Sequence, residues 1–253
     1  MRLSKIEWTE ATWNPSIGCN KVSAGCLNCY AEVMAKRLQA MGVNDYRDGF
    51  NFKIIPDRLD VPLKTKKPTK FFVNSMSDLW HEKMPECFLD KIFNVIKETP
   101  HHTYQILTKR AERMSDYFKR HPDIPENVWL GVTVENRSVK NRIDHLRKTS
   151  AHIKFLSIEP LLEDIKDLNL KNIDWVIVGG ESGFNARPMR SDWVIKIKDQ
   201  CKKQNVAFFF KQWGTWGADG KKRNKRVNGR RLQNRVWSEY PDVIKATSQK
   251  KGV

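Results

Sequence analysis

The chain has 253 residues, a length that allows one large hydrophobic core and fits a single barrel-sized domain. Its 46 Lys and Arg residues outnumber the 29 Asp and Glu residues, and the net charge of +17 favours a polyanionic partner, most often nucleic acid. The sequence shows no apolar run of transmembrane length and no signal peptide, so it predicts a cytoplasmic protein whose five cysteines stay reduced.

The first notable feature along the chain is a loop with three cysteines, which follows a short predicted strand near residues 11–18 and precedes a predicted helix over 29–41. Cys19, Cys26 and Cys29 have the spacing C-x6-C-x2-C, and the aromatic Tyr30 comes next. Three thiolates can hold three irons of a [4Fe-4S] cluster and leave the fourth iron open for a substrate or cofactor. A structural zinc site is the alternative, because C-x2-C is also its commonest half, but no histidine occurs before His81.

Six short runs, rich in β-branched and aromatic residues, predict buried parallel strands at 70–74, 103–107, 128–134, 153–158, 174–178 and 206–210. Helical patterns lie between most of them, at 85–99, 110–120, 137–148 and 191–204. This rhythm of βα units predicts an α/β fold, a partial or full (β/α) barrel, with a doubly wound open sheet as runner-up. No boundary is visible before about residue 214, so we expect a barrel over 1–214 and a basic C-terminal extension over 215–253.

Polar or ionisable residues follow each predicted strand, where the active sites of barrels are built. One such strand end would mean little, but six in succession predict a single polar site at one face, which the cysteine loop shares. The residues concerned are Ser75, Ser77, Asp78, Lys109, Thr133, Glu135, Glu159 and Glu181.

A basic segment, residues 221–235, contains eight Lys or Arg residues and no acid. We expect it to contact nucleic acid, and the alternative is a solvated tail. The predicted contacts are Lys221, Lys222, Arg223, Lys225, Arg226, Arg230 and Arg231, with Trp213 as a possible platform for a stacked base.

Some candidates allow two interpretations. Glu159 and Glu181 could form a general acid/base pair, or bind ribose and orient arginines. Cys87 and Cys201 lie in predicted helices, where a buried, unreactive thiol is expected, although Cys87 is also a candidate hydrogen donor. His81 is either a substrate contact or an exposed loop histidine.

With these residues in view, the chain resembles radical S-adenosylmethionine (SAM) proteins. It resembles most a family of phage and prophage proteins with a three-cysteine motif, which is distantly similar to spore photoproduct lyase. The motifs that carry the resemblance span nearly the whole chain and lie at residues 8–15, 18–30, 75–81, 107–110, 131–136, 157–161, 178–183 and 209–214.

The resemblance implies a role for each matching position. Cys19, Cys26 and Cys29 would ligate the cluster. Ser75, Ser77 and Asp78 would hold the SAM amino group, Lys109 the SAM carboxylate, and Thr133 and Glu135 the ribose, with Tyr30 also on the cofactor side. One departure is the first cysteine gap, which is six residues here and three in the common radical SAM loop. Residues 179–181, Gly-Gly-Glu, follow a late strand and are therefore assigned to the substrate side.

The expected function is that of a radical SAM enzyme, of isomerase or lyase type, with a [4Fe-4S] cluster, SAM and an external electron donor. Its expected target is a nucleic-acid base, most plausibly a thymine or modified thymine in phage DNA, for hypermodification or lesion reversal. The alternative is a zinc-stapled nucleic-acid-binding protein without catalysis. The oligomeric state stays open.

Overall fold

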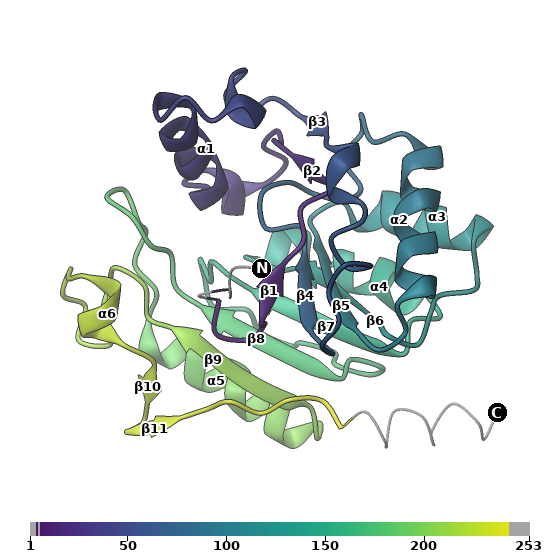
Figure 1. Cartoon of the computed structure of the whole chain (residues 1–253). Helices are drawn as coiled ribbons and strands as arrows, with labels where there is room; N and C mark the ends of the chain where they lie inside the picture. Colours follow the sequence, from purple (N-terminus) through teal and green to yellow (C-terminus); the bar gives the residue numbers. More distant parts are fainter. Residues whose placement is uncertain (1–3, 5, 243–253) are drawn as a thin grey trace.

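The computed structural model describes residue 4 and residues 6–242, and Figure 1 shows the arrangement of their elements. A seven-stranded sheet forms the centre, and every neighbouring pair in it is parallel. The strands lie in chain order, without the reversal of a doubly wound sheet, and β1 does not pair with β9, so the sheet is an open, partial barrel. In sheet order they are β1 (Ala11–Thr12), β4 (Lys70–Val73), β5 (Thr103–Thr108), β6 (Val128–Thr133), β7 (Ile153–Ile158), β8 (Trp175–Gly179) and β9 (Ala207–Gln212).

The predicted α/β partial barrel is therefore confirmed, and each of the six predicted strands is present within about two residues of its expected bounds. The helices are α1 (Tyr30–Ala40), α2 (Glu86–Glu98), α3 (Ala111–Arg120), α4 (Arg142–Arg147) and α5 (Ser191–Lys203). The helix expected over 137–148 is shorter, because residues 137–139 form a 3-10 turn, η4 (Arg137–Val139), ahead of α4.

Side chains of the sheet alternate between two hydrophobic clusters. On the outer face, residues such as Val73, Ile106 and Val178 pack with side chains of the helices. On the inner face, a second cluster is mostly aromatic and closes the inside of the sheet; its members are Trp8, Phe72, Trp129, Ile153, Phe155, Trp175, Ile177 and Phe209. A Cβ on Gly131 would lie 2.4 Å from the Phe155 ring, so glycine allows this ring to lie flat against β6.

The cysteine loop belongs to an excursion between β1 and β4 that stands apart from the other helices (Figure 1). It contains the antiparallel pair β2 (Ser16–Ile17) and β3 (Lys53–Ile54), and three 3-10 turns, η1 (Ala24–Cys26), η2 (Asn44–Tyr46) and η3 (Pro56–Arg58). A small cluster of its own, including Ile17, Ala35 and Tyr46, packs it together. The single strand expected near 11–18 is thus two short strands in different sheets.

The chain after β9 packs along the edge of the sheet. It forms α6 (Lys225–Asn228) and the hairpin β10 (Arg231–Leu232) and β11 (Arg235–Val236). Leu232 is 1 % exposed within the outer core, and the backbones of Trp237 and Glu239 bond to those of Phe210 and Phe208 in β9. These contacts cover β9, an edge strand that would otherwise be open to pairing with another chain. The division at residue 214 stays a prediction, and residues 243–253 of the expected extension lie outside the described residues.

Within residue 4 and residues 6–242, no helix has the length and apolar character needed to cross a membrane.

Candidate functional site

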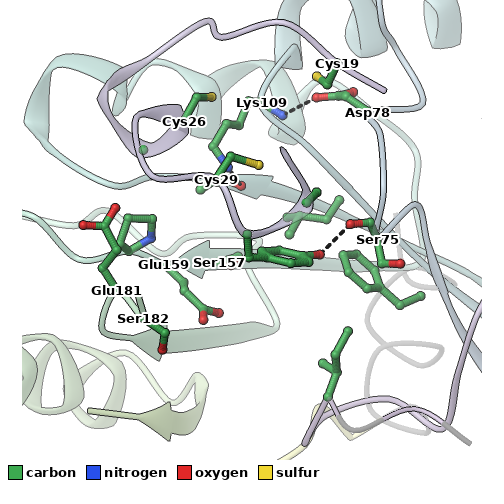
Figure 2. A pocket seen from close by; sticks show the side chains of 18 of the residues that line it. Cys19, Cys26, Cys29, Ser75, Asp78, Lys109, Ser157, Glu159, Glu181 and Ser182 are labelled. Carbon is green, nitrogen blue, oxygen red and sulfur yellow. Dashed lines mark hydrogen bonds between the residues drawn. The ribbon is translucent and has the colours of Figure 1, made fainter. Parts of the chain in front are cut away.

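A cavity of about 360 Å³ lies at the carboxyl ends of the parallel strands, under the cysteine loop. Figure 2 shows side chains from the loop and from successive strand ends around it. The structure therefore brings together most residues that the sequence predicted for one site. Those in the wall are Cys19, Cys26, Cys29, Tyr30, Ser75, Ser77, Asp78, Lys109, Thr133, Glu159 and Glu181.

The cysteine loop begins at Gly18, which has φ +76°, and a Cβ there would lie 2.0 Å from the Asn51 carbonyl oxygen. Only glycine fits this turn. Cys26 ends η1 and Cys29 directly precedes α1, and the three thiols are partly buried. No group of three or more His, Cys, Asp or Glu side chains among the described residues is arranged around a single metal ion.

Arg110, directly after β5, anchors the start of the loop. Its guanidinium lies 3.3 Å from Asp78 Oδ2 and donates to Cys19 Sγ (3.4 Å) and to Asn20 Oδ1 (2.7 Å). Burial raises the pKa of the Cys19 thiol, and the nearby Arg110 charge opposes that shift. A positive charge beside the sulfur also favours a thiolate ligand.

Asp78 is the centre of this anchor. Its carboxylate accepts hydrogen bonds from Thr108 Oγ1 (2.7 Å) and from the backbone N–H groups of Lys109 (3.0 Å) and Trp80 (3.0 Å), besides its ion pair with Arg110. The Lys109 bond is one of the two dashed lines in Figure 2. Asp78 therefore joins the ends of β4 and β5 beneath Cys19.

Glu135, after β6, anchors the middle of the loop from below. It is fully buried, does not line the cavity, and accepts hydrogen bonds from Arg142 Nη1 (2.9 Å), the Gly25 N–H (3.2 Å) and the Ser23 hydroxyl. Burial alone would raise its pKa, but the charges of Arg142 and Lys109 outweigh it and hold the pKa of Glu135 below its usual range. The structure thus gives Glu135 hydrogen-bond partners inside the protein, outside the cavity wall.

Glu181, after β8, anchors the end of the loop. Its Oε2 accepts from Asn28 Nδ2 (3.0 Å), and Arg187 approaches both oxygens, with Nη2 2.6 Å from Oε1. Burial would raise the pKa of Glu181, yet the hydrogen bonds from Arg187 lower it. A carboxylate held ionised in this way is a poor proton donor near neutral pH.

The β4 side of the cavity is a wall of hydroxyl and amide groups. Ser77 Oγ lies 2.6 Å from Ser16 Oγ and accepts from Asn74 Nδ2 (2.7 Å), and the Tyr30 hydroxyl donates to the Ser75 carbonyl oxygen (2.6 Å). Lys109 reaches across from β5 to Thr133 Oγ1 (3.4 Å). Among the described residues, Lys109 forms no ion pair with a carboxylate.

The opposite side of the cavity is formed by the ends of β7, β8 and β9. Lys211 Nζ donates to both carboxylate oxygens of Glu159, at 2.8 and 2.9 Å. Gln212 lies beside this pair, and Lys225 of the basic segment reaches Gln212 Oε1 (3.4 Å). Figure 2 shows Glu159, Glu181 and Ser182 together at this end, away from Ser75.

Three expectations are not met by the structure. Trp213 is 2 % exposed and its indole N–H donates to the Arg231 carbonyl oxygen (2.8 Å), so it is a core residue and not a stacking platform. Cys87 is exposed on α2, neither buried nor in the cavity wall, and is poorly placed to donate hydrogen to a bound substrate. His81 is 2 % exposed and stacks on Phe52 at 4.1 Å, so it is neither an exposed loop residue nor a substrate contact.

Cys201 is buried as expected, and burial raises the pKa of its thiol to about 12. Of the basic segment, Lys225 alone is part of the cavity wall, while Lys221, Lys222, Arg226 and Arg231 are exposed. Arg223 pairs with Asp219, and Arg230 donates to Ser238 Oγ (2.6 Å).

Sequence reasoning missed the structural role of Arg110 and the pocket contact of Lys211. Arg110 directly follows the selected residue Lys109, and Lys211 directly follows the predicted strand 206–210, so the position at a strand end was the available signal.

The fold and the site define an α/β partial-barrel protein with a three-cysteine loop over the carboxyl ends of its strands. The chain belongs to the family described as "Protein of unknown function (DUF5131)", which it matches over residues 3–241. Among curated proteins, none matches the chain.

Solved structures of spore photoproduct lyase show a distant likeness. One, complexed with dinucleoside spore photoproduct, is 13% identical with a TM-score of 0.47, covering 80% of this chain and 63% of that chain. A double variant with bound AdoMet and dinucleoside spore photoproduct is 12% identical with a TM-score of 0.41, covering 70% and 58%. This chain thus spans 63% or less of the length of these two proteins. The likeness is distant and says nothing of substrate or site residues; the phage relationship stays a prediction.

Proposed function

We propose that the protein is a radical SAM enzyme that binds a [4Fe-4S] cluster through Cys19, Cys26 and Cys29 and acts on a nucleic-acid base. One observation carries the proposal: three thiols of one loop line the same cavity as the polar ends of consecutive parallel strands. A cavity of this kind, at the carboxyl ends of barrel strands, is where such folds build active sites.

The arrangement of the cysteines favours a cluster over a zinc staple. A zinc ion needs about four ligands that converge on one point, at about 2.0–2.3 Å. In a [4Fe-4S] cluster each cysteine ligates a different iron, so the three sulfurs surround a larger group and do not converge. The described residues contain no convergent group, but they do place three thiols around one cavity. The donor set therefore fits the cluster.

We assign the β4–β6 side of the cavity to SAM. Lys109 is suited to the SAM carboxylate, because its ammonium lies in the wall and forms no direct ion pair with a carboxylate among the described residues. Ser75, Ser77 and Thr133 offer hydroxyl groups to the amino and ribose ends. Asp78 adds negative charge near the amino group, and Tyr30 closes this side. Glu135 acts in this proposal as a support for the cysteine loop.

When bound, the cluster and SAM supply one-electron cleavage of SAM and abstraction of hydrogen from the substrate; the electron comes from an external donor. The protein itself positions the cofactor and the substrate and excludes water. The aromatic inner cluster contributes Trp8 and Phe72 to the cavity wall, and this apolar surface shields the reacting groups.

The proposed target is a base in DNA, namely thymine or a modified thymine. The net charge of +17 and the basic segment beside the cavity support a nucleic acid, since Lys225 joins that segment to the cavity wall. A base must leave its stack to reach a buried site. Phe184 replaces Trp213 as the stacking candidate: it is 88% exposed, near the cavity residue Ser182, and Lys222 Nζ lies 4.8 Å from its ring centroid.

Equilibrium binding of SAM to the anaerobically prepared protein, followed by a 5′-deoxyadenosine assay with a strong reductant, tests the proposal. We expect cleavage of SAM by the native chain, and Lys109→Ala to weaken SAM binding about 10-fold, because a charge-assisted hydrogen bond is lost. Lys83→Ala, an exposed lysine outside the cavity, is the matched control. Equal affinity of the two variants would remove Lys109 from the SAM site, and a cluster-loaded protein that never cleaves SAM would contradict the proposed function.

A further inference from the structure

We propose that the ends of β7, β8 and β9 form a subsite that recognises a cyclic imide edge, in which an N–H group lies between two carbonyl groups. The subsite consists of Lys211, Glu159, Gln212 and Ser182, and it lies across the cavity from the side assigned to SAM. The inference rests on the proposed function, because it assumes that a nucleobase enters this cavity.

The four side chains form one connected hydrogen-bonded row. Lys211 Nζ donates to both oxygens of Glu159, and Gln212 Nε2 lies 3.4 Å from Glu159 Oε1 and 3.3 Å from Ser182 Oγ. The row is partly buried: the side chains of Lys211 and Glu159 are 16% and 20% exposed. All four residues line the cavity, so a ligand there meets the row directly.

The internal bonds of the row leave capacity for a ligand. An ammonium group has three N–H donors, and Lys211 directs two of them at Glu159. A carboxylate offers about four lone-pair positions, of which the row occupies three. The Ser182 hydroxyl oxygen accepts from Gln212 and, within residue 4 and residues 6–242, donates to no protein atom. The row therefore presents three groups to the cavity, in this order: an N–H donor of Lys211, an acceptor oxygen of Glu159 and the O–H donor of Ser182.

The orientation of the row is held by a neighbouring lysine of the cavity wall and by the backbone at the end of β8. Lys225 Nζ lies 3.4 Å from Gln212 Oε1, which turns the Gln212 N–H₂ group toward Glu159 and Ser182. A Cβ on Gly179 would lie 3.0 Å from the Glu159 carboxyl carbon, so the strand backbone presses directly against this carboxylate. The polar groups are thus pre-organised and need no rearrangement to receive a ligand.

A donor–acceptor–donor row is complementary to an acceptor–donor–acceptor edge. Thymine and uracil present that edge as two carbonyl oxygens flanking N3–H, whereas cytosine presents an amino group and two acceptors. A cytosine-type edge would place its amino group against a donor of the row and its N3 acceptor against the carboxylate of Glu159, which would then have no donor to accept from. Sites built from buried polar groups reject such mismatches more strongly than apolar pockets do.

Competition binding with short single-stranded oligonucleotides at high salt tests the subsite, because high salt reduces the shared phosphate contribution. The central base is thymine, 5-methylcytosine, which has the same shape with another edge, or N3-methylthymine, which lacks the N–H. We expect the native chain to prefer thymine over each of the others by about 10-fold or more. No preference, or no binding of any of the three, would overturn the inference.

Two variants and a control identify the residues responsible. Glu159→Ala and Ser182→Ala should each reduce the thymine preference to about 2-fold or less, since they remove the acceptor and one of the two flanking donors. Glu163→Ala is the matched control, because Glu163 also pairs with one cation, Arg137, but lies outside the cavity. A preference that survives both variants would contradict the assignment.

The result is separable from the proposed function. Cleavage of SAM without any base preference would overturn the subsite alone. A thymine preference that depends on Glu159, in a protein that binds no cluster, would support the subsite and contradict the radical SAM proposal.

Discussion

Glu135 has no exposed surface, and its two oxygens connect a buried arginine with the middle of the cysteine loop. Replacing one partner of a buried pair leaves the other charge unpaired, which costs about 3–5 kcal/mol. We therefore expect Glu135→Gln to lower the free energy of unfolding by about 3 kcal/mol in denaturant titrations. Glu163→Gln, in an exposed pair with Arg137, should cost less than about 1 kcal/mol.

The pH dependence of this variant follows from the sign of the shift. Because the folded protein holds the pKa of Glu135 below its usual value, the stabilisation is complete above the ordinary glutamate pKa of about 4.3. It is lost as the pH falls through the lower, folded value. The unfolding free energy of the native chain should thus decrease more steeply than that of Glu135→Gln as the pH is lowered below about 4.3. Parallel curves for the two proteins would mean that Glu135 is not ionised by its surroundings.

Among the described residues, Phe184 is the most exposed of the large apolar side chains, and it lies next to Lys222. Stacking of a base on an aromatic side chain contributes about 1–3 kcal/mol, so Phe184→Ala should weaken single-stranded DNA binding about 5- to 150-fold. Met41→Ala, at the end of α1 and 67% exposed, is the control for loss of exposed apolar surface. Equal effects of both substitutions would exclude a stacking role.

At the level of single residues, the sequence predicted which residues lie in the site better than it predicted the role of each residue. Polar residues at strand ends converge because parallel strands end at one edge, and this brought Lys109, Glu159 and Glu181 into the cavity wall. Their partners come from distant segments, such as Asn28 for Glu181, and no local pattern encodes them. Trp213 was misjudged because a tryptophan after a strand has the same local sequence whether it stacks on a ligand or fills the core.

The basic segment is the element whose role is most open to direct test. Lys221, Lys222, Arg226 and Arg231 are exposed on and around α6 and β10. Neutralising these side chains should weaken duplex DNA binding almost equally for all sequences. It should also reduce the slope of log affinity against log salt by up to about 4, since each phosphate contact contributes about 0.9.

The control for this experiment is an equal loss of charge elsewhere. Lys91 and Lys97 on α2, with Lys202 and Lys203 on α5, are exposed lysines remote from the cavity wall. If their neutralisation changes the salt slope as much as that of the basic segment, binding is spread over the whole surface and the segment has no special part.

The elements that the sequence predicted well are those with long local patterns. Buried parallel strands are apolar throughout, and six such runs appear as β4 to β9. The hairpin of β10 and β11 was not predicted, because its strands have two residues each and half of those residues are arginine. Its turn residues Gln233 and Asn234 have φ values of +51° and +60°, a type I′ turn whose Gln-Asn sequence is a weaker signal than Asn-Gly.

For the whole molecule, chain order and sheet order coincide, so consecutive strands place their polar ends side by side around one cavity. The excursion between β1 and β4 then lays the cysteine loop across that cavity, held by Arg110, Glu135 and Glu181. Those three contacts join the loop to the ends of β5, β6 and β8, so the proposed cluster site depends on strands from both halves of the sheet. The sequence could predict the sheet and the loop, but not that the loop is tied to three separate strands.

The most direct test of the account is the metal content of protein expressed and purified without oxygen. We expect about four irons and four sulfides per chain, lost on replacing Cys19, Cys26 or Cys29 by Ala and kept in Cys87→Ala and Cys201→Ala, whose thiols lie outside the cavity. Stoichiometric zinc without iron, or iron that survives the loss of all three loop cysteines, would contradict the proposed cluster site.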